Sequence, residues 1–399
     1  MRIERIESIP VTVPIEAPIL TCYGALSSYS RNVIKIHTDD GLTGYAETSA
    51  WIKPEQVHAF EKVIQGWSPW EITKLSSRIG NWNYYTRTEL LAAALEMACL
   101  DLQAKSAEIP LYELLGGKVR DKAPVAAYVF FRHANAEGKG EIHDANAVAE
   151  FSKRMVDRYG FDTIKLKGGY FSPDEDLESM QALRDTFGPG AKLRIDPQGA
   201  WSPAIAIAIG QKLDQVGLEY YEDPCWGMAS MAQVAAHVRS PLATNMCVTS
   251  FDHVAPALSM KAVDVILSDL WYWGGIRPTQ QLDRVGGAFG LGIGMHSGCE
   301  LGIGWAAMIH TAVTMPNLKL AIDNMNIHLS DDILVGGKLL PSGGEIAPPD
   351  GPGLGVEIDE AKLQHYHELA TSGTAVDRYL DPKAPDPIRP EWFARMPAW

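Results

Sequence analysis

The chain has 399 residues, 46% of them hydrophobic and 21% charged, so it can bury a sizeable core divided into two or three lobes. Its formal net charge of -14 argues against nucleic acid or an anionic membrane surface as a partner. Five dispersed cysteines without a C-x-x-C pair, and an N-terminus without an apolar signal region, predict a cytoplasmic protein that has neither a disulfide framework nor a membrane anchor.

The first lobe combines strands and helices. Residues 1 to 47 contain three β-rich runs, and Asp39-Asp40-Gly41 predicts a hairpin turn between the last two. Residues 53 to 120 have the apolar spacing of helices, most clearly in TELLAAALEMACLDLQAKSA. We therefore expect an N-terminal α+β domain over residues 1 to 123.

Eight short β-rich runs then alternate with helix-like stretches. They are VAAYVF, TIKLKGG, KLRIDPQG, LEYYEDP, LATNM, VDVILSD, LGIGMHS and LKLAIDN. Successive runs are separated by enough residues for one helix and two short loops, which predicts parallel strands closed into a β/α barrel over residues 124 to 325. The alternative, a doubly wound open sheet, is weakened because no G-x-G-x-x-G stands at a strand-to-helix turn.

The last segment, residues 326 to 399, is rich in proline and glycine, as in PSGGEIAPPDGPGLG. Such a composition is typical of chain that wraps over existing structure instead of building another core.

Three oxygen-bearing side chains end three consecutive runs of the barrel: Asp196, Glu222 and Asn245. Taken singly they could be a turn residue, part of a solvated loop and a helix N-cap. Neighbouring strands lie about 4.8 Å apart, so the three can point at one centre. Two carboxylates and an amide carbonyl are hard ligands, and the sequence therefore predicts a Mg²⁺ site.

Two lysines and a histidine complete the candidate site. Lys165 and Lys167 are two residues apart on a strand, so both face the barrel interior, where charge repulsion, a metal and desolvation should lower a lysine pKa. The alternative is an exposed edge strand protected by lysines. Asp269 and His296 end neighbouring strands, and a carboxylate beside an imidazole makes an acid/base pair; a lone histidine would otherwise be a satisfied core group.

These residues and motifs resemble the enolase superfamily, in particular the mandelate racemase type and the glucarate dehydratase group. The likeness rests on KLKGG at 165, D-P-x-G-A-W-S at 196, EDPC at 222, ATNM at 243 and PGLGVEID at 352. It covers nearly the whole chain. It implies a modified TIM barrel, (β/α)7β, with an N-terminal α+β capping domain that the C-terminal segment completes, and a lysine or histidine base acting with magnesium on an enediolate.

The resemblance also implies roles for single residues. Lys167 becomes one acid/base, with Lys165 beside it touching the substrate carboxylate, and His296, backed by Asp269, becomes the other. Further residues are implied to contact the substrate, namely Tyr128, Gln198, Ser297 and Asp323.

The chain departs from the family pattern where relatives recognise the substrate away from the metal. Gln198 replaces an asparagine, the run after His296 reads Ser297-Gly298-Cys299, and a capping-loop histidine is missing around Ala25. These departures put glucarate itself in doubt but not proton abstraction. Arg31 and Arg378 are candidates for binding a distal carboxylate. The aromatic run 271 to 273 could line a sugar-binding wall, although loop packing is the simpler interpretation.

The function predicted from the sequence is Mg²⁺-dependent dehydration of an acid sugar, an aldonate or aldarate, to a 2-keto-3-deoxy acid. A racemase or epimerase could use the same two bases without losing hydroxide. A noncatalytic barrel that binds an acid or serves as a scaffold is a third possibility, but it gives no reason to keep these groups together. We expect a small-molecule substrate and a homo-oligomer.

Overall fold

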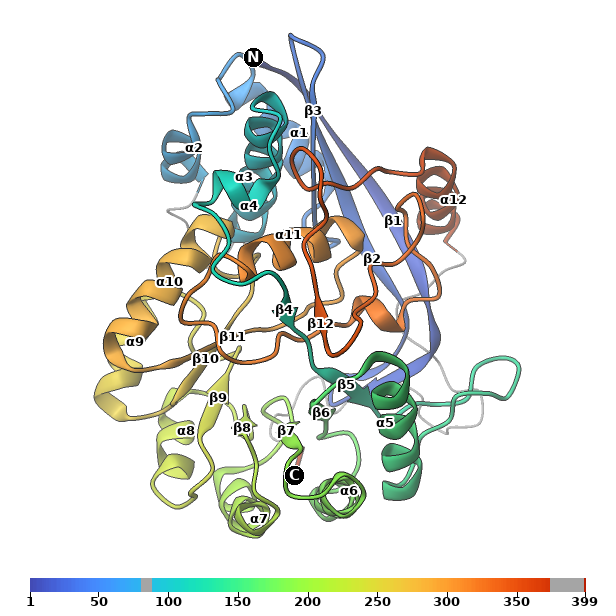
Figure 1. Cartoon of the computed structure of the whole chain (residues 1–399), viewed down its shortest axis with the longest axis vertical. Helices are drawn as coiled ribbons and strands as arrows, with labels where there is room; N and C mark the ends of the chain where they lie inside the picture. Colours follow the sequence, from blue (N-terminus) through green and yellow to red (C-terminus); the bar gives the residue numbers. More distant parts are fainter. Residues whose placement is uncertain (80–87, 374–397) are drawn as a thin grey trace.

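The computed structural model describes residues 1–79, 88–373 and 398–399. Figure 1 shows a curled parallel sheet surrounded by helices, next to an antiparallel sheet that carries its own helices. The predicted α/β architecture with a separate N-terminal cap is confirmed. The domain boundaries at residues 123 and 325 stay a prediction.

The cap contains an antiparallel sheet in the order β1-β2-β3, formed by β1 (Ile3–Thr21), β2 (Gly24–Thr38) and β3 (Thr43–Ser49). The predicted hairpin turn joins β2 to β3, and Thr38 N–H donates to Leu42 O at 3.1 Å across it. β1 is longer than its sequence run indicated, and it turns into β2 at Cys22 and Tyr23.

Four cap helices follow, as predicted: α1 (Pro54–Ile64), α2 (Ile72–Ile79), α3 (Thr88–Ser106) and α4 (Leu111–Leu114). Every residue from Leu90 to Ala104 in α3 is buried. A helix buried on all sides must contact structure on all sides, and α3 does so because it packs against β3, α2, α4 and the barrel helix α10.

The barrel sheet has seven parallel strands in the order β11-β10-β9-β8-β7-β6-β5. Seven of the eight predicted runs form these strands, which are β5 (Ala127–Phe130), β6 (Thr163–Lys167), β7 (Lys192–Asp196), β8 (Tyr220–Glu222), β9 (Leu242–Thr244), β10 (Val265–Ser268) and β11 (Gly292–Met295). The intervening helices are α5 (Ala145–Tyr159), α6 (Pro173–Phe187), α7 (Pro203–Val216), α8 (Met228–Ala235), α9 (Phe251–Met260), α10 (Ile276–Phe289) and α11 (Gly302–Ala312).

The eighth predicted run is not a regular strand. It makes one isolated parallel bridge on each side, Leu318 with Ile293 of β11 and Ile322 with Val125 before β5. Ile322 N–H also donates to Pro124 O at 2.8 Å. The two edges of the sheet are therefore joined through this segment, which gives seven strand–helix units closed by an irregular eighth piece.

Local sequence signals start the helices behind the site. Ser172 accepts a hydrogen bond from Glu175 N–H at the start of α6 and forms a capping box with Glu175. Ser202 caps α7 in the same way, and a proline occupies the first turn of both helices. The chain therefore leaves β6 and β7 through short loops, and this fixes where their last residues point.

The described part of the C-terminal segment wraps back as predicted. β12 (Glu345–Ile346) pairs with β4 (Ala123–Pro124), and the short helix η1 (Asn326–His328) lies near β1. The helix α12 (Glu360–Thr371), which the composition did not predict, packs on β1. Lys35 Nζ of β2 lies 2.6 Å from Glu360 Oε1, so both ends of the chain contribute to the cap.

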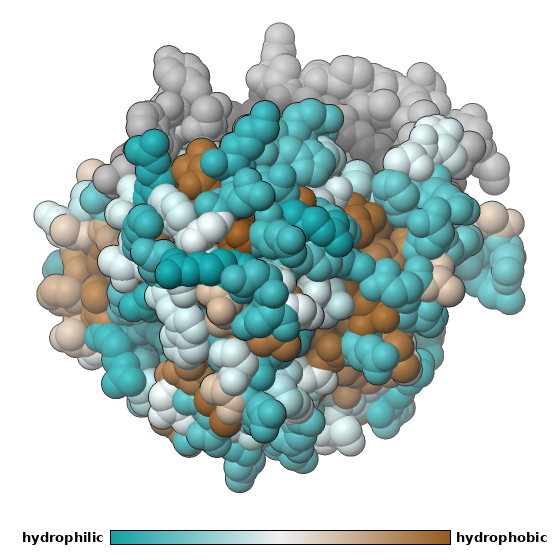
Figure 2. All heavy atoms as spheres, turned by 90° about the horizontal axis from the view of Figure 1, so that it is seen from above, coloured by the Kyte–Doolittle hydropathy of each residue, from teal (hydrophilic) through white to brown (hydrophobic). Residues whose placement is uncertain are grey.

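Hydrophilic side chains cover most of the face seen from above in Figure 2, with hydrophobic residues in small patches between them. All five cysteines have free thiols. Among the described residues, no helix combines the length and apolar character required to span a membrane.

Candidate active site

Strand register sorts the interior side chains into two levels. Lys165 is level with Tyr128 of β5 and Arg194 of β7, whereas Lys167 is level with Asp196 at the end of β7. Residues two apart on a strand face the same side, which places both lysines inside the barrel, as predicted. The deeper lysine is fully buried and Lys167 is 7% exposed, so Lys167 is the one that can be reached from the mouth.

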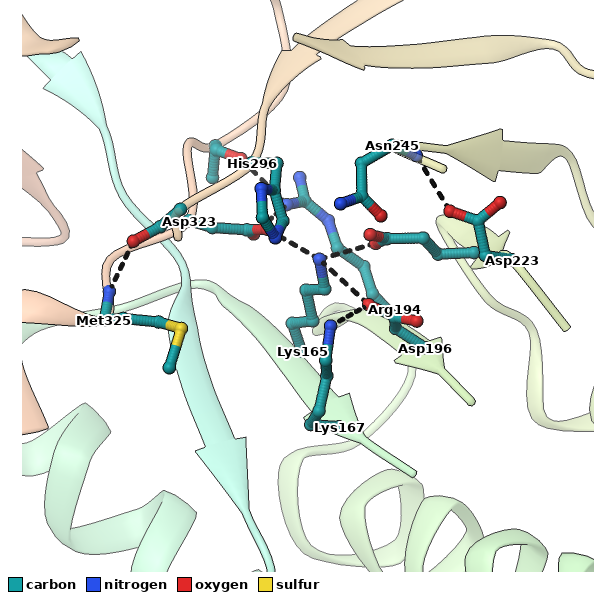
Figure 3. Close-up of polar contacts among 12 residues, drawn as sticks. Lys165, Lys167, Arg194, Asp196, Asp223, Asn245, His296, Asp323 and Met325 are labelled. Atoms are coloured by element: carbon teal, nitrogen blue, oxygen red, sulfur yellow. Dashed lines mark hydrogen bonds and ion pairs between the residues drawn. The ribbon is translucent and has the colours of Figure 1, made fainter. Parts of the chain in front are cut away.

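The two ammonium groups lie among three carboxylates. Lys165 Nζ is 2.6 Å from Asp323 Oδ2, 2.5 Å from Glu222 Oε2 and 3.8 Å from Asp196 Oδ2. Lys167 Nζ is 2.5 Å from the same Asp196 oxygen. Figure 3 shows Lys165 between these groups, which come from opposite parts of the barrel wall. The interior is therefore a compact cluster in which each ammonium has a carboxylate partner.

This cluster corrects the predicted lysine pKa values. Desolvation lowers the pKa of Lys167, but the carboxylates of Asp196 and Glu222 raise it by more, and the net pKa stands above its ordinary value. The same balance holds the pKa of Lys165 well above its ordinary value, with Asp323 as the largest charge. The expectation of lowered values considered the two lysines and a metal but not the carboxylates that face them.

The carboxylates respond in opposite directions. Burial, together with the charge on Asp196, raises the pKa of Glu222 well above its usual range. For Asp196, desolvation raises the pKa, but both lysines oppose it and the net value is lowered. The pair therefore shares its negative charge unequally, with Asp196 as the stronger anion.

The three predicted metal ligands fit a hard cation. Asp196 and Glu222 are the last residues of β7 and β8, and Asn245 directly follows β9. Glu222 Oε1 and Asn245 Oδ1 are buried and accept no hydrogen bond from the described residues. Buried acceptors without donors are costly, and oxygen-only sets suit Mg²⁺. Among the described residues no group of three His, Cys, Asp or Glu side chains could hold a metal, because the third ligand here is an amide.

Asp223 holds Asn245 in place, a role that the sequence interpretation missed. It accepts hydrogen bonds from Thr244 Oγ1 at 2.6 Å and from Asn245 N–H at 2.8 Å. Its backbone has φ +32°, and Gln198 and Cys299, each beyond the end of another barrel strand, have φ +59° and +61°. Left-handed backbone at three non-glycine residues is strained, and such strain gathers at functional sites.

The predicted acid/base pair also forms. Asp269 directly follows β10 and His296 directly follows β11, and His296 Nδ1 lies 3.0 Å from Asp269 Oδ2. The other oxygen, Asp269 Oδ1, accepts hydrogen bonds from Trp271 N–H at 2.8 Å and Tyr272 N–H at 3.2 Å. With Nδ1 engaged, Nε2 of His296 is left for other partners. The side chain is 12% exposed, so it can reach a ligand at the mouth.

The predicted substrate-binding residues are placed unequally. Asp323 and Tyr128 do lie at the centre: the Tyr128 ring centroid is 4.8 Å from Lys165 Nζ, and its hydroxyl has no hydrogen-bond partner among the described residues. Gln198 meets the cap, because Cys22 N–H donates to its Oε1 at 3.0 Å. Contact of these residues with a substrate stays a prediction.

Two other predicted contacts are not supported by the structure. Ser297 is fully buried; its hydroxyl donates to Glu300 Oε2 at 2.5 Å and accepts from Met325 N–H at 2.9 Å, so it fixes the loop after β11. The Arg31 guanidinium is 3.0 Å from Glu47 and 4.6 Å from the Trp271 ring centroid. It is already paired inside the junction of cap and barrel. The other candidate, Arg378, lies outside the described residues.

The aromatic run after β10 is loop packing, as the simpler interpretation had it. Trp271 and Trp273 are 3% and 7% exposed, and Trp273 packs edge-to-face on Phe251. Trp271 Nε1–H donates to Glu47 O at 2.7 Å. The loop is thus held by the cap.

A buried arginine was also missed. Arg194 Nη1–H donates to Ala321 O at 2.8 Å, its Nε lies 2.6 Å from Glu219 Oε2, and its guanidinium stacks 4.5 Å from the Tyr220 ring centroid. It lies two residues before Asp196 on the same strand, so the spacing rule that placed both lysines inside also applies to it.

Family comparisons agree with this geometry. A model of the enolase C-terminal domain-like family matches residues 147–362, and a model of the mandelate racemase/muconate lactonizing enzyme N-terminal domain matches residues 5–116. Together they cover the barrel and the cap.

Individual relatives differ in activity. A Streptomyces coelicolor protein named probable glucarate dehydratase is 38% identical, covering 96% of both chains. An N-succinyl-L-Arg/Lys racemase from Bacillus cereus is 25% identical, covering 91% of this chain and 97% of its own. A crystal structure of an enolase from Pseudomonas fluorescens Pf0-1 with bound magnesium, potassium and tartrate superposes with a TM-score of 0.88 at 31% identity, covering 100% and 99%. The chain is therefore a member of the mandelate racemase/muconate lactonizing enzyme family, within the enolase superfamily of enzymes.

Proposed function

We propose that this enzyme is a Mg²⁺-dependent acid-sugar dehydratase. It would remove the proton beside a substrate carboxylate and expel the 3-hydroxyl, giving a 2-keto-3-deoxy acid. One observation carries the proposal: two accessible acid/base groups, Lys167 on β6 and His296 after β11, flank the three oxygen ligands that end β7, β8 and β9.

Asp196, Glu222 and Asn245 would hold the metal ion. When bound, Mg²⁺ supplies positive charge that stabilises the negative charge developing on the substrate carboxylate. Lys165 lies within 3.8 Å of two of these ligands and remains a cation under the charges around it. It therefore adds a second, fixed positive charge at the place where the enediolate oxygens would lie.

Lys167 is the candidate base for one face of the substrate. An amine removes a proton only in its neutral form, and the contact with Asp196 opposes that form. Positive charge placed on Asp196 and Glu222 would weaken this opposition. We therefore expect proton abstraction by Lys167 to depend on the metal ligands even though none of them touches the substrate proton.

His296 is the candidate acid/base for the other face. Its Nδ1 contact with Asp269 orients the ring and leaves Nε2 to exchange protons with the substrate. Expulsion of hydroxide requires a proton donor within hydrogen-bond reach of the 3-hydroxyl, and His296 would provide it. The relative named probable glucarate dehydratase supports a dehydratase, and tartrate in the Pseudomonas fluorescens structure supports a hydroxy acid as ligand.

A racemase or epimerase is the second candidate. The two opposed groups would suffice for it, since inversion at C2 requires one base on each face, and the Bacillus cereus racemase shares the family. The two reactions differ only in the fate of the intermediate. A substrate with a 3-hydroxyl close to His296 eliminates, whereas one without it is reprotonated.

A library of aldonates and aldarates in D₂O with Mg²⁺ tests the proposal. Formation of a 2-keto acid supports dehydration, and a deuterated or inverted acid without ketone supports epimerisation. The variants Lys167→Ala and His296→Asn should each lose turnover by at least 10²-fold, the lower range for a general acid/base. Lys192→Ala, which removes an exposed lysine, is the control and should keep full activity. No ketone and no deuterium incorporation with any acid would contradict both candidates.

A further inference from the structure

Glu47 is a fully buried cap residue, and no step of the proposed reaction uses it. It lies near the end of β3 and is 0% exposed. Its carboxylate accepts hydrogen bonds from Leu301 N–H and Gly304 N–H, each at 3.0 Å, at the start of the barrel helix α11. Negative charge is favourable at a helix N-terminus, so the cap contributes a fixed anion to this end of α11.

The same residue also holds the neighbouring loop. Its backbone carbonyl accepts the Trp271 Nε1–H at 2.7 Å, and Trp271 N–H in turn donates to Asp269 Oδ1 at 2.8 Å. The loop after β10 carries Asp269, and the loop from β11 to α11 carries His296. Glu47 is therefore bonded to both loops that carry the candidate acid/base pair.

The packing around Glu47 leaves no spare room. A Cβ at Gly304 would lie 2.8 Å from Trp271 and 2.9 Å from the Glu47 carboxyl carbon. Arg31 bridges the two, because its Nε lies 3.0 Å from Glu47 Oε1 and its guanidinium stacks on the Trp271 ring. Sterics and charge thus fix the position of Glu47 relative to both loops.

We propose that Glu47 is a positioning residue for the His296 acid/base: from the cap, it sets the relative position of the two loops that bear Asp269 and His296. The inference rests on the proposed function for the role of His296, but its geometric part does not. Glu47 does not touch the substrate and acts only through Trp271, Leu301 and Gly304.

The cap provides a matched control. Asp101 of α3 is also fully buried, accepts from Tyr45 N–H and Leu354 N–H at 2.8 Å each, and pairs with Lys105 at 2.7 Å. It thus has one cation and two backbone donors, as Glu47 has, but it contacts neither loop of the acid/base pair. Comparing Glu47→Gln with Asp101→Asn separates positioning from general loss of a buried charge.

The first readout needs no substrate. Ring ¹⁵N spectra of ¹⁵N-histidine-labelled protein, with His296 assigned through His296→Asn, report the tautomer and the hydrogen bond to Asp269. We expect the His296 ring signals to shift in Glu47→Gln and to stay at their wild-type positions in Asp101→Asn. Unchanged His296 signals in a folded Glu47→Gln protein would overturn the proposal.

The second readout uses the two faces of the substrate. Deuterium exchange at C2 through His296 should fall at least tenfold in Glu47→Gln, while exchange through Lys167 stays within twofold of wild type. Equal losses on both faces would overturn positioning. If wild type exchanges no acid, the proposed function fails, and the ring spectra still decide the geometric claim.

A second variant guards against a fold defect. Trp271→Phe keeps an aromatic ring beside Arg31 and removes only the N–H donor to Glu47 O. It should shift the His296 signals in the same direction as Glu47→Gln and reduce the exchange through His296 by a smaller factor. Wild-type spectra and exchange in this variant would show that the Trp271 connection carries no positioning.

Discussion

Replacing Lys165 by methionine should make the stability of the protein depend on pH and on Mg²⁺. The ammonium lies 2.5 to 3.8 Å from three carboxylates, those of Glu222, Asp323 and Asp196, and all four side chains are at most 1% exposed. Removing one partner of a buried ion pair typically costs about 3–5 kcal/mol, because the remaining charge is left uncompensated. We expect a loss of that size for Lys165→Met in EDTA at pH 8.

The loss should shrink in acid. Without the ammonium the carboxylates hold protons more tightly in the folded than in the unfolded state, and burial already raises the pKa of Glu222. Acids whose folded pKa is raised lose stability as pH rises, so the deficit at pH 5 should be smaller, by up to about 1.4 kcal/mol per pH unit. Mg²⁺ at about 100 times its Kd should return about 2.7 kcal/mol by mass action.

Urea denaturation at pH 5 and pH 8, with EDTA or with Mg²⁺, measures these effects. The control is Lys192→Met, which removes a lysine 3.0 Å from Asp162 in an exposed ion pair and should cost at most about 1 kcal/mol. A Lys165→Met loss no larger than that of the control, or the same loss at both pH values, would refute the reasoning.

Three further predictions concern buried carboxylates and their neighbours. Burial raises the pKa of Glu96 to about 8, so Glu96→Gln should gain stability relative to wild type between pH 5 and pH 8 in urea denaturation, by at least about 1 kcal/mol. A Cβ at Gly275, where φ is +137°, would lie 1.8 Å from Glu96 Oε2, so Gly275→Ala should cost at least about 1–3 kcal/mol, and less in a Glu96→Ala background, as a double-mutant cycle checks. Thr244→Val removes a 2.6 Å hydrogen bond to Asp223, which should cost about 1–3 kcal/mol and weaken Mg²⁺ binding through Asn245, measured by calorimetry; an unchanged Kd would separate Asp223 from the metal ligands.

Much of the barrel could be predicted from the sequence because its signals are local. Each strand is a short apolar run, and its polar last residues stand where the structure needs them. The two-residue spacing placed Lys165 and Lys167 on one face, and the regular strand–helix period brought Asp196, Glu222 and Asn245 to neighbouring strand ends. The eighth run, with one bridge on each side, had the composition of a strand but not its pairing.

The contacts that the sequence did not reveal join residues far apart in the chain. Glu47 meets Leu301 and Trp271 more than 200 residues away, and the pKa of Lys165 depends on Asp323 across the barrel. Arg31 looked available for a substrate carboxylate because its partner, Glu47, cannot be paired with it until the β2–β3 register is known. Local patterns predict which face a side chain takes but not what lies opposite.

The arrangement of the cap affects how the chain can fold while it is being synthesised. β1 and β2 leave the ribosome first, yet Lys35 pairs with Glu360, 325 residues later, and Pro10 O with His367, 357 residues later. At about 5–20 residues per second, the first strands wait roughly 16 to 65 seconds for α12. During that interval the surface of β1 that α12 later covers remains exposed, which makes nascent chains of this enzyme suitable clients for a chaperone that shields β-sheet surfaces.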